Sequence, residues 1–165
     1  MAETIKLIIR KEEHEDYLRF VFGSQKKGPI LIDRNKDIGK YISSRVRYAD
    51  NPQTLRSVKG EFLVDLILPE RGLRTAASHF VHFSLEDIDK INDYLTAEFN
   101  QFFRGYMLAG EEMNIEYKDL IESFMMGIGI RNPGTKFDTL KKKDYRHRDK
   151  IHKIVVESLQ RIGYQ

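Results

Sequence analysis

The residues with the clearest chemical potential form a basic segment near the C-terminus. Eight lysines and arginines lie between Lys136 and Lys153, and Arg131 lies just upstream. Phosphate is recognised by cations that can follow a charged backbone, and arginine adds a planar fork that holds two phosphate oxygens. A tyrosine within the segment could stack on a base or a sugar. We therefore predict a nucleic-acid surface, for DNA or RNA, made of Lys141, Lys142, Lys143, Tyr145, Arg146 and Arg148.

The net charge of +3 conceals an uneven distribution along the chain. Residues 1–83 carry 15 basic and 11 acidic side chains, residues 84–130 carry 3 and 10, and residues 131–165 carry 10 and 4. Such asymmetry indicates either a surface for nucleic acid or an electrostatic contact inside the protein. In the second interpretation the basic tail pairs with carboxylates of the acidic middle, and its charge is neutralised.

An alternative function follows from the acidic middle itself. Residues 84–109 have the spacing of one long helix, and this acidic helix could pair with a basic surface on a partner protein or on a second copy of the chain. In that case the protein is an interaction or assembly module, which could form a homo-oligomer.

Signals for catalysis are weaker. Glu61, Asp65 and Glu70 lie close to an apolar strand, but a metal-dependent nuclease needs carboxylates that converge on one ion, and no acid-x-lysine motif follows. His79 and His82 are three residues apart without a third ligand close in sequence, whereas zinc requires three or four. The absence of cysteine excludes thiolate chemistry. We predict no catalytic residue, no metal site and no cofactor.

The run FDTLKKKDYRHR, residues 137–148, resembles the C-terminal ends of small uncharacterised proteins from bacterial phages and mobile elements. The likeness covers residues 117–150. The resemblance implies a mobile-element setting and a role close to DNA.

The elements that must position these residues begin with short strands. Apolar and β-branched runs predict strands at 5–9, 30–32, 62–68 and 79–83, and a helix at 37–48 capped by Asp37. The run 62–68 is almost entirely apolar, which predicts that both of its faces are covered, and it is expected to pair antiparallel with 79–83. Spacing does not settle the structure of residues 11–22.

Helical periodicity takes over after residue 83. Ser84 and Asp87 resemble a capping box at the start of a helix that ends near Gly110. A shorter helix follows with Asn114 as its cap, and a third helical region starts near Thr135. The region contains a second apolar stripe and is either one helix with a polar middle or two helices with a bend. The loop at 128–135 is about twice the length of a helix-turn-helix connection.

These elements predict an α+β fold. We expect a small, mainly antiparallel N-terminal sheet with one helix in residues 1–83 and about three helices in residues 84–165, packed on the sheet as one domain. No apolar run is long enough to span a membrane, and the first residues do not resemble a signal peptide. We therefore predict a cytoplasmic protein without a membrane partner.

Overall fold

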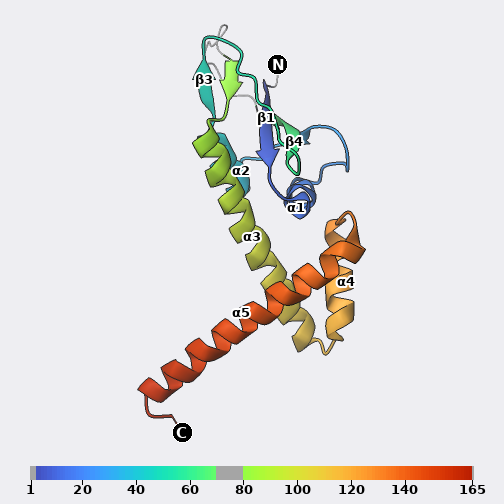
Figure 1. Ribbon diagram of the computed structural model, residues 1–165, viewed down its shortest axis with the longest axis vertical. Helices are drawn as coiled ribbons and strands as arrows, with labels where there is room; N and C mark the ends of the chain where they lie inside the picture. The colour runs from blue at the N-terminus through green and yellow to red at the C-terminus, as the bar shows by residue number, and fades with distance from the viewer. Residues whose placement is uncertain (1–2, 70–79, 165) are drawn as a thin grey trace. The chain divides into compact units, whose positions relative to one another are not determined.

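The computed structural model describes residues 3–69 and 80–164 and has the predicted α+β fold, with a small sheet followed by a helical region (Figure 1). Along the chain, the elements are β1 (Glu3–Ile9), α1 (Glu12–Phe22), β2 (Ile30–Leu31), α2 (Asp37–Ser44), β3 (Arg47–Ala49), β4 (Phe62–Leu68), β5 (Phe80–His82), α3 (Leu85–Glu112), α4 (Tyr117–Ile128) and α5 (Pro133–Arg161).

The chain forms two compact units, each of which is described by itself. The first unit contains the residues up to Phe102 and the short segment Ile128–Arg131. The second contains Phe103–Gly127 and the chain from Asn132 onward. Helix α3 thus supplies residues to both units. The single-domain organisation expected from composition, with parts 1–83 and 84–165, stays a prediction.

In the first unit, β4 is the central strand of a sheet with the order β1-β4-β2. It pairs antiparallel with β1, with Leu66 opposite Ile5, and parallel with β2. The chain between β2 and β4 contains α2 and β3, which is long enough for the crossover that parallel strands require. The predicted pairing of β4 with the strand at 79–83 is wrong, because β5 pairs with β3 instead. His79 lies outside the described residues.

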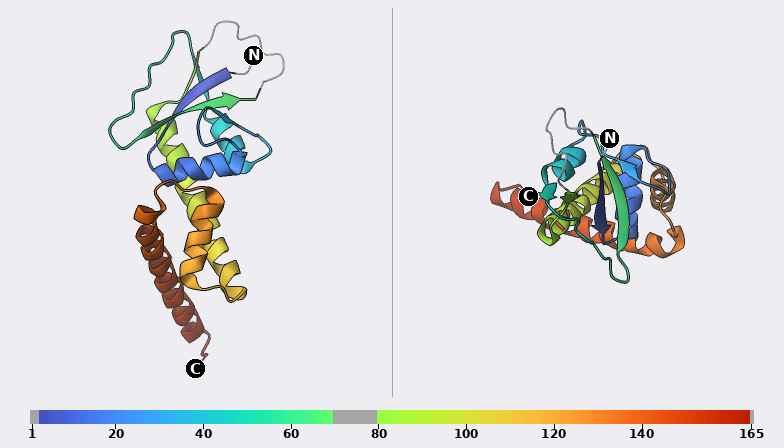
Figure 2. Two further views of the ribbon diagram at one scale, coloured as in Figure 1. Left: turned by 90° about the vertical axis from the view of Figure 1, so that its right-hand side faces the viewer. Right: turned by 90° about the horizontal axis from the view of Figure 1, so that it is seen from above.

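Helices cover one face of this sheet. Ile5 and Leu7 of β1 and Val64 and Leu66 of β4 alternate with their neighbours in the strands and are all buried. Figure 2 shows α1, α2 and the first half of α3 on one side of the strands. The prediction that both faces of 62–68 are covered is wrong, since Leu63 on the opposite face is 41% exposed.

The segment that spacing left unsettled forms α1, so this region has two helices where one was predicted. Tyr17 and Leu18 enter the core, and the ring of Tyr17 meets the ring of Phe99 edge-on, with 5.7 Å between centroids. Much of the buried surface of α1 is nevertheless charged, and includes Glu15 and Asp16. Hydrophobic periodicity cannot reveal a helix whose buried positions are occupied by carboxylates.

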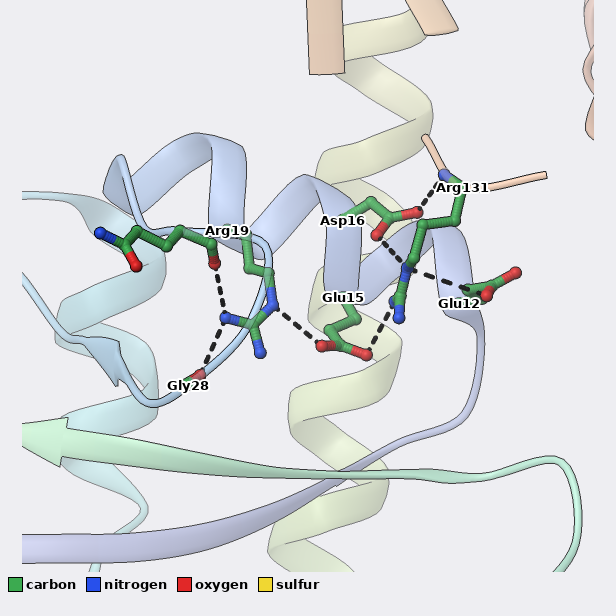
Figure 3. Close-up of polar contacts among 7 residues, drawn as sticks. Glu12, Glu15, Asp16, Arg19, Gly28 and Arg131 are labelled. Atoms are coloured by element: carbon green, nitrogen blue, oxygen red, sulfur yellow. Dashed lines mark hydrogen bonds and ion pairs between the residues drawn. The ribbon is translucent and has the colours of Figure 1, made fainter. Parts of the chain in front are cut away.

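These buried charges form one connected network, drawn in Figure 3. The Arg131 side chain donates from Nε to Asp16 Oδ1 at 2.7 Å and from Nη2 to Glu15 Oε2 at 2.8 Å, and its backbone N–H donates to Asp16 Oδ2 at 2.9 Å. On the other side of Glu15, Arg19 Nε donates to Oε1 at 2.9 Å. Arg19 Nη1 also donates to the carbonyls of Gln25 and Gly28. The network thus joins α1, the loop after it and the segment between α4 and α5.

The start of α3 is fixed by the predicted capping box. The backbone N–H of Asp87 donates to Ser84 Oγ at 3.1 Å, and the backbone N–H of Ser84 donates back to Asp87 Oδ2 at 3.3 Å. Arg47 of β3 adds an ion pair to the same carboxylate, which is 1% exposed. Aspartate at this position therefore closes the box in both directions.

In the second unit, the last turns of α3 pack against α4. The rings of Phe103 and Phe124 lie 4.8 Å apart, and both side chains are fully buried. Helix α3, predicted to end near Gly110, ends at Glu112. A Cβ atom at Gly110 would lie 1.9 Å from Leu120 Cδ2, so the glycine permits the close approach of α4.

Several predicted helix ends are corrected. Helix α2 stops at Ser44, and Lys36 rather than Asp37 occupies its N-cap. Asn114 follows α3 in a left-handed conformation, with φ of 56°, and does not cap α4. Helix α5 begins at Pro133, and the Thr135 hydroxyl donates to the Asn132 carbonyl.

Of the two alternatives left open for the third helical region, the continuous one is found. Helix α5 runs as a single helix over Pro133–Arg161. The connection from α4 is only four residues, 129–132, which is half the predicted loop and equals the usual length of a helix-turn-helix connection. Within residues 3–69 and 80–164, no helix has the apolar length needed to cross a membrane.

We expect the Arg131→Met variant to lose about 2–3 kcal/mol of unfolding free energy at pH 7, because it leaves the buried carboxylate of Asp16 without its cation and removes one of the two arginines that pair with Glu15. Arg131 is 36% exposed, which keeps the figure below that of a fully buried pair. Burial already raises the pKa of Asp16, and the bonds from Arg131 oppose that rise. A protonated Asp16 needs no cation, so the deficit should shrink as pH falls through the raised pKa.

Urea unfolding at pH 7 and pH 4.5 measures this effect. Lys6→Met is the matched control, because Lys6 pairs with Asp65 at 2.9 Å on the surface, with side chains 54% and 46% exposed. The control should change stability by less than about 1 kcal/mol. Equal losses in the two variants would show that the Arg131 network is not a buried constraint.

We expect the Asp87→Asn variant to be less stable by about 1–2 kcal/mol at pH 7, because it weakens the capping box and removes the ion pair with Arg47. The hydrogen bond from Arg47 holds the pKa of Asp87 well below its usual range, and bonds from Ser84 act in the same direction. The stability due to this carboxylate is present above the unfolded pKa near 4 and is lost as pH falls toward the folded value. Thermal unfolding between pH 2.5 and 7 should therefore show a shallower acid limb in the variant than in the native chain.

Candidate nucleic-acid interface

One side of α5 forms an open, cation-lined groove in the second unit. The groove has a volume of about 640 Å³. Steps of three and four residues along α5 bring its lining side chains to one side of the helix. Arg104 joins them from α3, and the full lining is Arg104, Thr139, Lys142, Lys143, Arg146, His147, Lys150, Ile151 and Ile154.

The lining of this groove is rich in positive charge and contains no carboxylate. Five of the nine lining residues are lysine or arginine, and none is acidic. Lys142, Arg146 and Lys150 are exposed, and they form no ion pair within the part of the chain that the structure describes. The Nε of Arg104 is buried without a hydrogen-bond partner there. Like charges held together without counter-charge favour the binding of an anion.

The pKa of His147 reflects the positive charge of the groove. Burial lowers the pKa of His147 below its ordinary value, and the positive charge of Arg104 lowers it further. Lys150 and Arg148 act in the same direction, while Asp144 opposes them. The side chain therefore favours its neutral form at physiological pH and, in that form, keeps one acceptor and one donor nitrogen.

The structure places the six residues predicted as the interface on two different sides of α5. Lys142, Lys143 and Arg146 line the groove. The other three lie on the side of α5 that faces α4. The ring of Tyr145 stacks on Tyr117 with 5.5 Å between centroids, and Lys141 Nζ lies 5.9 Å from the centroid of the Tyr145 ring.

Arg148 is the predicted contact residue that is most engaged inside the protein. Its Nε donates to Asp144 Oδ2 at 2.5 Å, and it also pairs with Glu111 of α3. Its guanidinium lies 5.6 Å from the centroid of the Tyr117 ring. Arg148 therefore fits the second interpretation of the charge asymmetry, in which carboxylates of the acidic middle neutralise the basic tail.

The acids at the beginning of α3 have partners in their own unit. Glu86 pairs with Lys90, Asp87 with Arg47, and Asp89 with Arg10. Their charge is therefore already compensated in part by neighbours. This leaves less free acidic surface for a basic partner than the sequence alone suggests.

Six of the nine lining residues are absent from the predicted interface, and three of these are basic side chains: Arg104, His147 and Lys150. Lys150 follows Arg146 by four residues, so helical spacing could have added it to the groove. His147 lies between two predicted cations and could have been included by the same spacing. Arg104 carries no such signal, because it is an isolated cation in the acidic middle and reaches the groove only through packing.

The residues considered for catalysis do not converge. Asp65 pairs with Lys6, and Glu61 accepts a hydrogen bond from the backbone N–H of Val58. Glu70 and His79 lie outside the described residues. Among residues 3–69 and 80–164, no group of three histidine or carboxylate side chains is placed to hold a metal ion.

Comparison with known proteins adds no assignment, because no protein-family model, no curated protein and no solved structure matches the chain.

We expect the Arg104→Gln variant to raise the pKa of His147, because the substitution removes the charge that disfavours the imidazolium form most. An NMR titration of the histidine ring protons measures this change. His82, on β5 in the first unit, is the internal reference. Lys118→Gln, on the surface of α4, should leave His147 unchanged. An unaltered His147 in Arg104→Gln would contradict the close electrostatic grouping described for the groove.

Proposed function

We propose that the protein is a non-enzymatic nucleic-acid-binding protein whose cationic groove contacts the phosphate backbone. The observation that carries the proposal is a groove lined by five cations and no acid, in which Lys142, Arg146 and Lys150 are exposed and form no ion pair among the described residues. Sequence-independent binding to nucleic acid depends on such cations, because each phosphate contact releases condensed counterions.

The shape of the cluster supports an extended ligand. Lys142, Arg146 and Lys150 follow one another at four-residue steps, so they span about 12 Å of helix. Thr139 adds a hydroxyl at one end of the row, and hydroxyl groups commonly bond phosphate oxygens. A row of this kind fits a backbone that carries repeated charges better than it fits a single small anion.

The connection between α4 and α5 also agrees with the proposal. Its four residues match the turn of a helix-turn-helix motif, in which the second helix enters the major groove of DNA. In this comparison α5 takes the place of the recognition helix, and its exposed basic side faces the duplex. Duplex DNA is therefore the first ligand to test, with single-stranded DNA and RNA beside it.

The wider setting belongs to the same proposal. Binding to nucleic acid implies a location where nucleic acid lies, which for this chain we take to be the cytoplasm. The resemblance of residues 117–150 to phage and mobile-element proteins adds the proposal of a mobile-element context. The alternative, in which the acidic helix binds a basic partner, has less support because Glu86, Asp87 and Asp89 already have basic neighbours.

We expect the native chain to bind duplex DNA with an affinity that falls steeply with salt. Five phosphate contacts predict a slope of log affinity against log salt of roughly −4 to −5. The double variant Lys142→Glu, Arg146→Glu should bind roughly 10- to 100-fold more weakly at 100 mM salt, with a slope shallower by about 2. Fluorescence anisotropy with a labelled duplex measures both quantities.

A matched control separates the groove from overall charge. Lys118→Glu, Lys153→Glu changes the net charge by the same amount at exposed positions outside the groove. This control should keep binding within about threefold of the native chain. Equal losses in the two double variants would leave only a general charge effect, and no binding by the native chain at low-micromolar concentration would refute the proposal.

A further inference from the structure

A second hollow lies beside the cationic groove, between α3 and α5. Figure 1 shows α5 crossing the last turns of α3, where Arg148 of α5 pairs with Glu111 of α3. The hollow has a volume of about 270 Å³. Steps of three and four residues bring its lining to one side of each helix. We call it the α3–α5 pocket, and the lining residues that matter here are Arg104, Met107, Leu108, His147, Ile151 and His152.

Aliphatic side chains from both helices line the α3–α5 pocket. Met107 is 1% exposed and forms its inner part. Leu108 of α3 and Ile151 of α5 are 59% and 44% exposed and lie nearer to solvent. Apolar side chains of this kind contact the faces of planar rings, as they do in pockets that receive an unpaired base. The pocket therefore offers apolar contact to a flat group that enters from solvent.

The polar groups of the pocket match the edges of a nucleobase. His147 in its neutral form has one donor and one acceptor nitrogen, and His152 adds a second imidazole. Bases present donors and acceptors along their edges. Asp144 and Arg148 also line the pocket, but Arg148 Nε donates to Asp144 Oδ2 at 2.5 Å. The one carboxylate of the lining is thus already paired, which favours a ligand that carries negative charge nearby.

The α3–α5 pocket and the cationic groove are neighbours. Both are lined by Arg104, His147 and Ile151. Arg146 and Lys150 of the groove directly precede the two shared residues of α5, so the groove and the pocket lie on adjacent sides of that helix. In a nucleotide the sugar joins the base to the phosphate, so a site for a base must lie directly beside a site for phosphate. A strand whose phosphates follow the cations can therefore place one base in the pocket.

We propose that the nucleic acid bound by the groove carries an unpaired base, and that this base enters the α3–α5 pocket. The inference rests on the function proposed above and defines its ligand more closely. In a duplex each base is stacked on both faces, and only its edges are open in the grooves. A base can contact Leu108 and Ile151 only after it leaves the stack, which costs least where the base is already unpaired. The preferred ligand is therefore a single strand or a duplex with a bulged base, rather than a fully paired duplex.

Size and charge favour this occupant over others. Sites for drug-sized ligands typically measure roughly 300–1,000 Å³. The pocket is slightly smaller, so it suits one compact ring. A free nucleotide would fill the pocket but would leave most of the row of cations, about 12 Å long, without phosphate. An apolar side chain of a protein partner would make no use of these cations.

Three labelled duplexes that differ at one position test the inference. The first is fully paired, the second carries one bulged thymine, and the third carries an abasic residue in place of that thymine. Fluorescence anisotropy at 100 mM salt should show that the native chain binds the bulged duplex about tenfold more tightly than the other two, since contact with the face of one base contributes an effect of this order. The abasic duplex controls for bending, because it keeps the bulge and lacks the base.

Leu108→Ser tests the pocket directly. Leu108 is exposed, so its substitution leaves the core intact. The variant should bind all three duplexes as the native chain binds the fully paired one, with the same salt dependence, because no cation is lost. Met126→Ser is the matched control, since Met126 is 83% exposed on α4 and lines neither the groove nor the pocket. The control should keep the tenfold preference for the bulged duplex.

The outcomes separate this inference from the proposed function. Equal affinity of the native chain for the three duplexes would overturn the inference and leave the phosphate contacts of the groove in place. A preference for the bulged duplex that persists in Leu108→Ser, or that the abasic duplex shares, would also overturn it. Absence of binding to all three duplexes at low-micromolar concentration would refute the proposed function, and the inference with it.

Discussion

The guanidinium of Arg131, held between the carboxylates of Glu15 and Asp16, is the constraint on which the first unit depends. Burying several charges is costly unless each finds a partner, and here the partners come from different segments of the chain. Arg19 extends the same set of bonds to the loop carbonyl of Gly28. These contacts hold α1, the loop after α1 and the segment 128–131 together in one unit. The connection between α4 and α5 is part of the first unit for this reason, although both helices mainly belong to the second.

Helix α5 shows how one element can serve several surfaces. Its first half uses one side to pack, through Leu140 and Asp144, and another to present Lys142 and Arg146 to solvent. Its second half continues the packing side without a partner. A helix of 29 residues is longer than the neighbours available within its unit can cover.

Local sequence patterns were sufficient for the α+β class, the strand at 62–68, the long helix after Ser84 and the cations of the tail, because each depends on residues close together in the chain. Two outcomes required tertiary structure. Helix α1 was hidden because its buried positions are charged and are stabilised by Arg131, whose bond to Asp16 spans 115 residues. The sequence also could not show which cations of the basic segment line the groove and which contact α3 or α4. Helical spacing tells which side chains share a side of the helix, but it does not tell which side contacts other elements. Glu111 neutralises Arg148 and Arg104 reinforces the groove only after the chain has folded, since both contacts join residues that are distant in sequence.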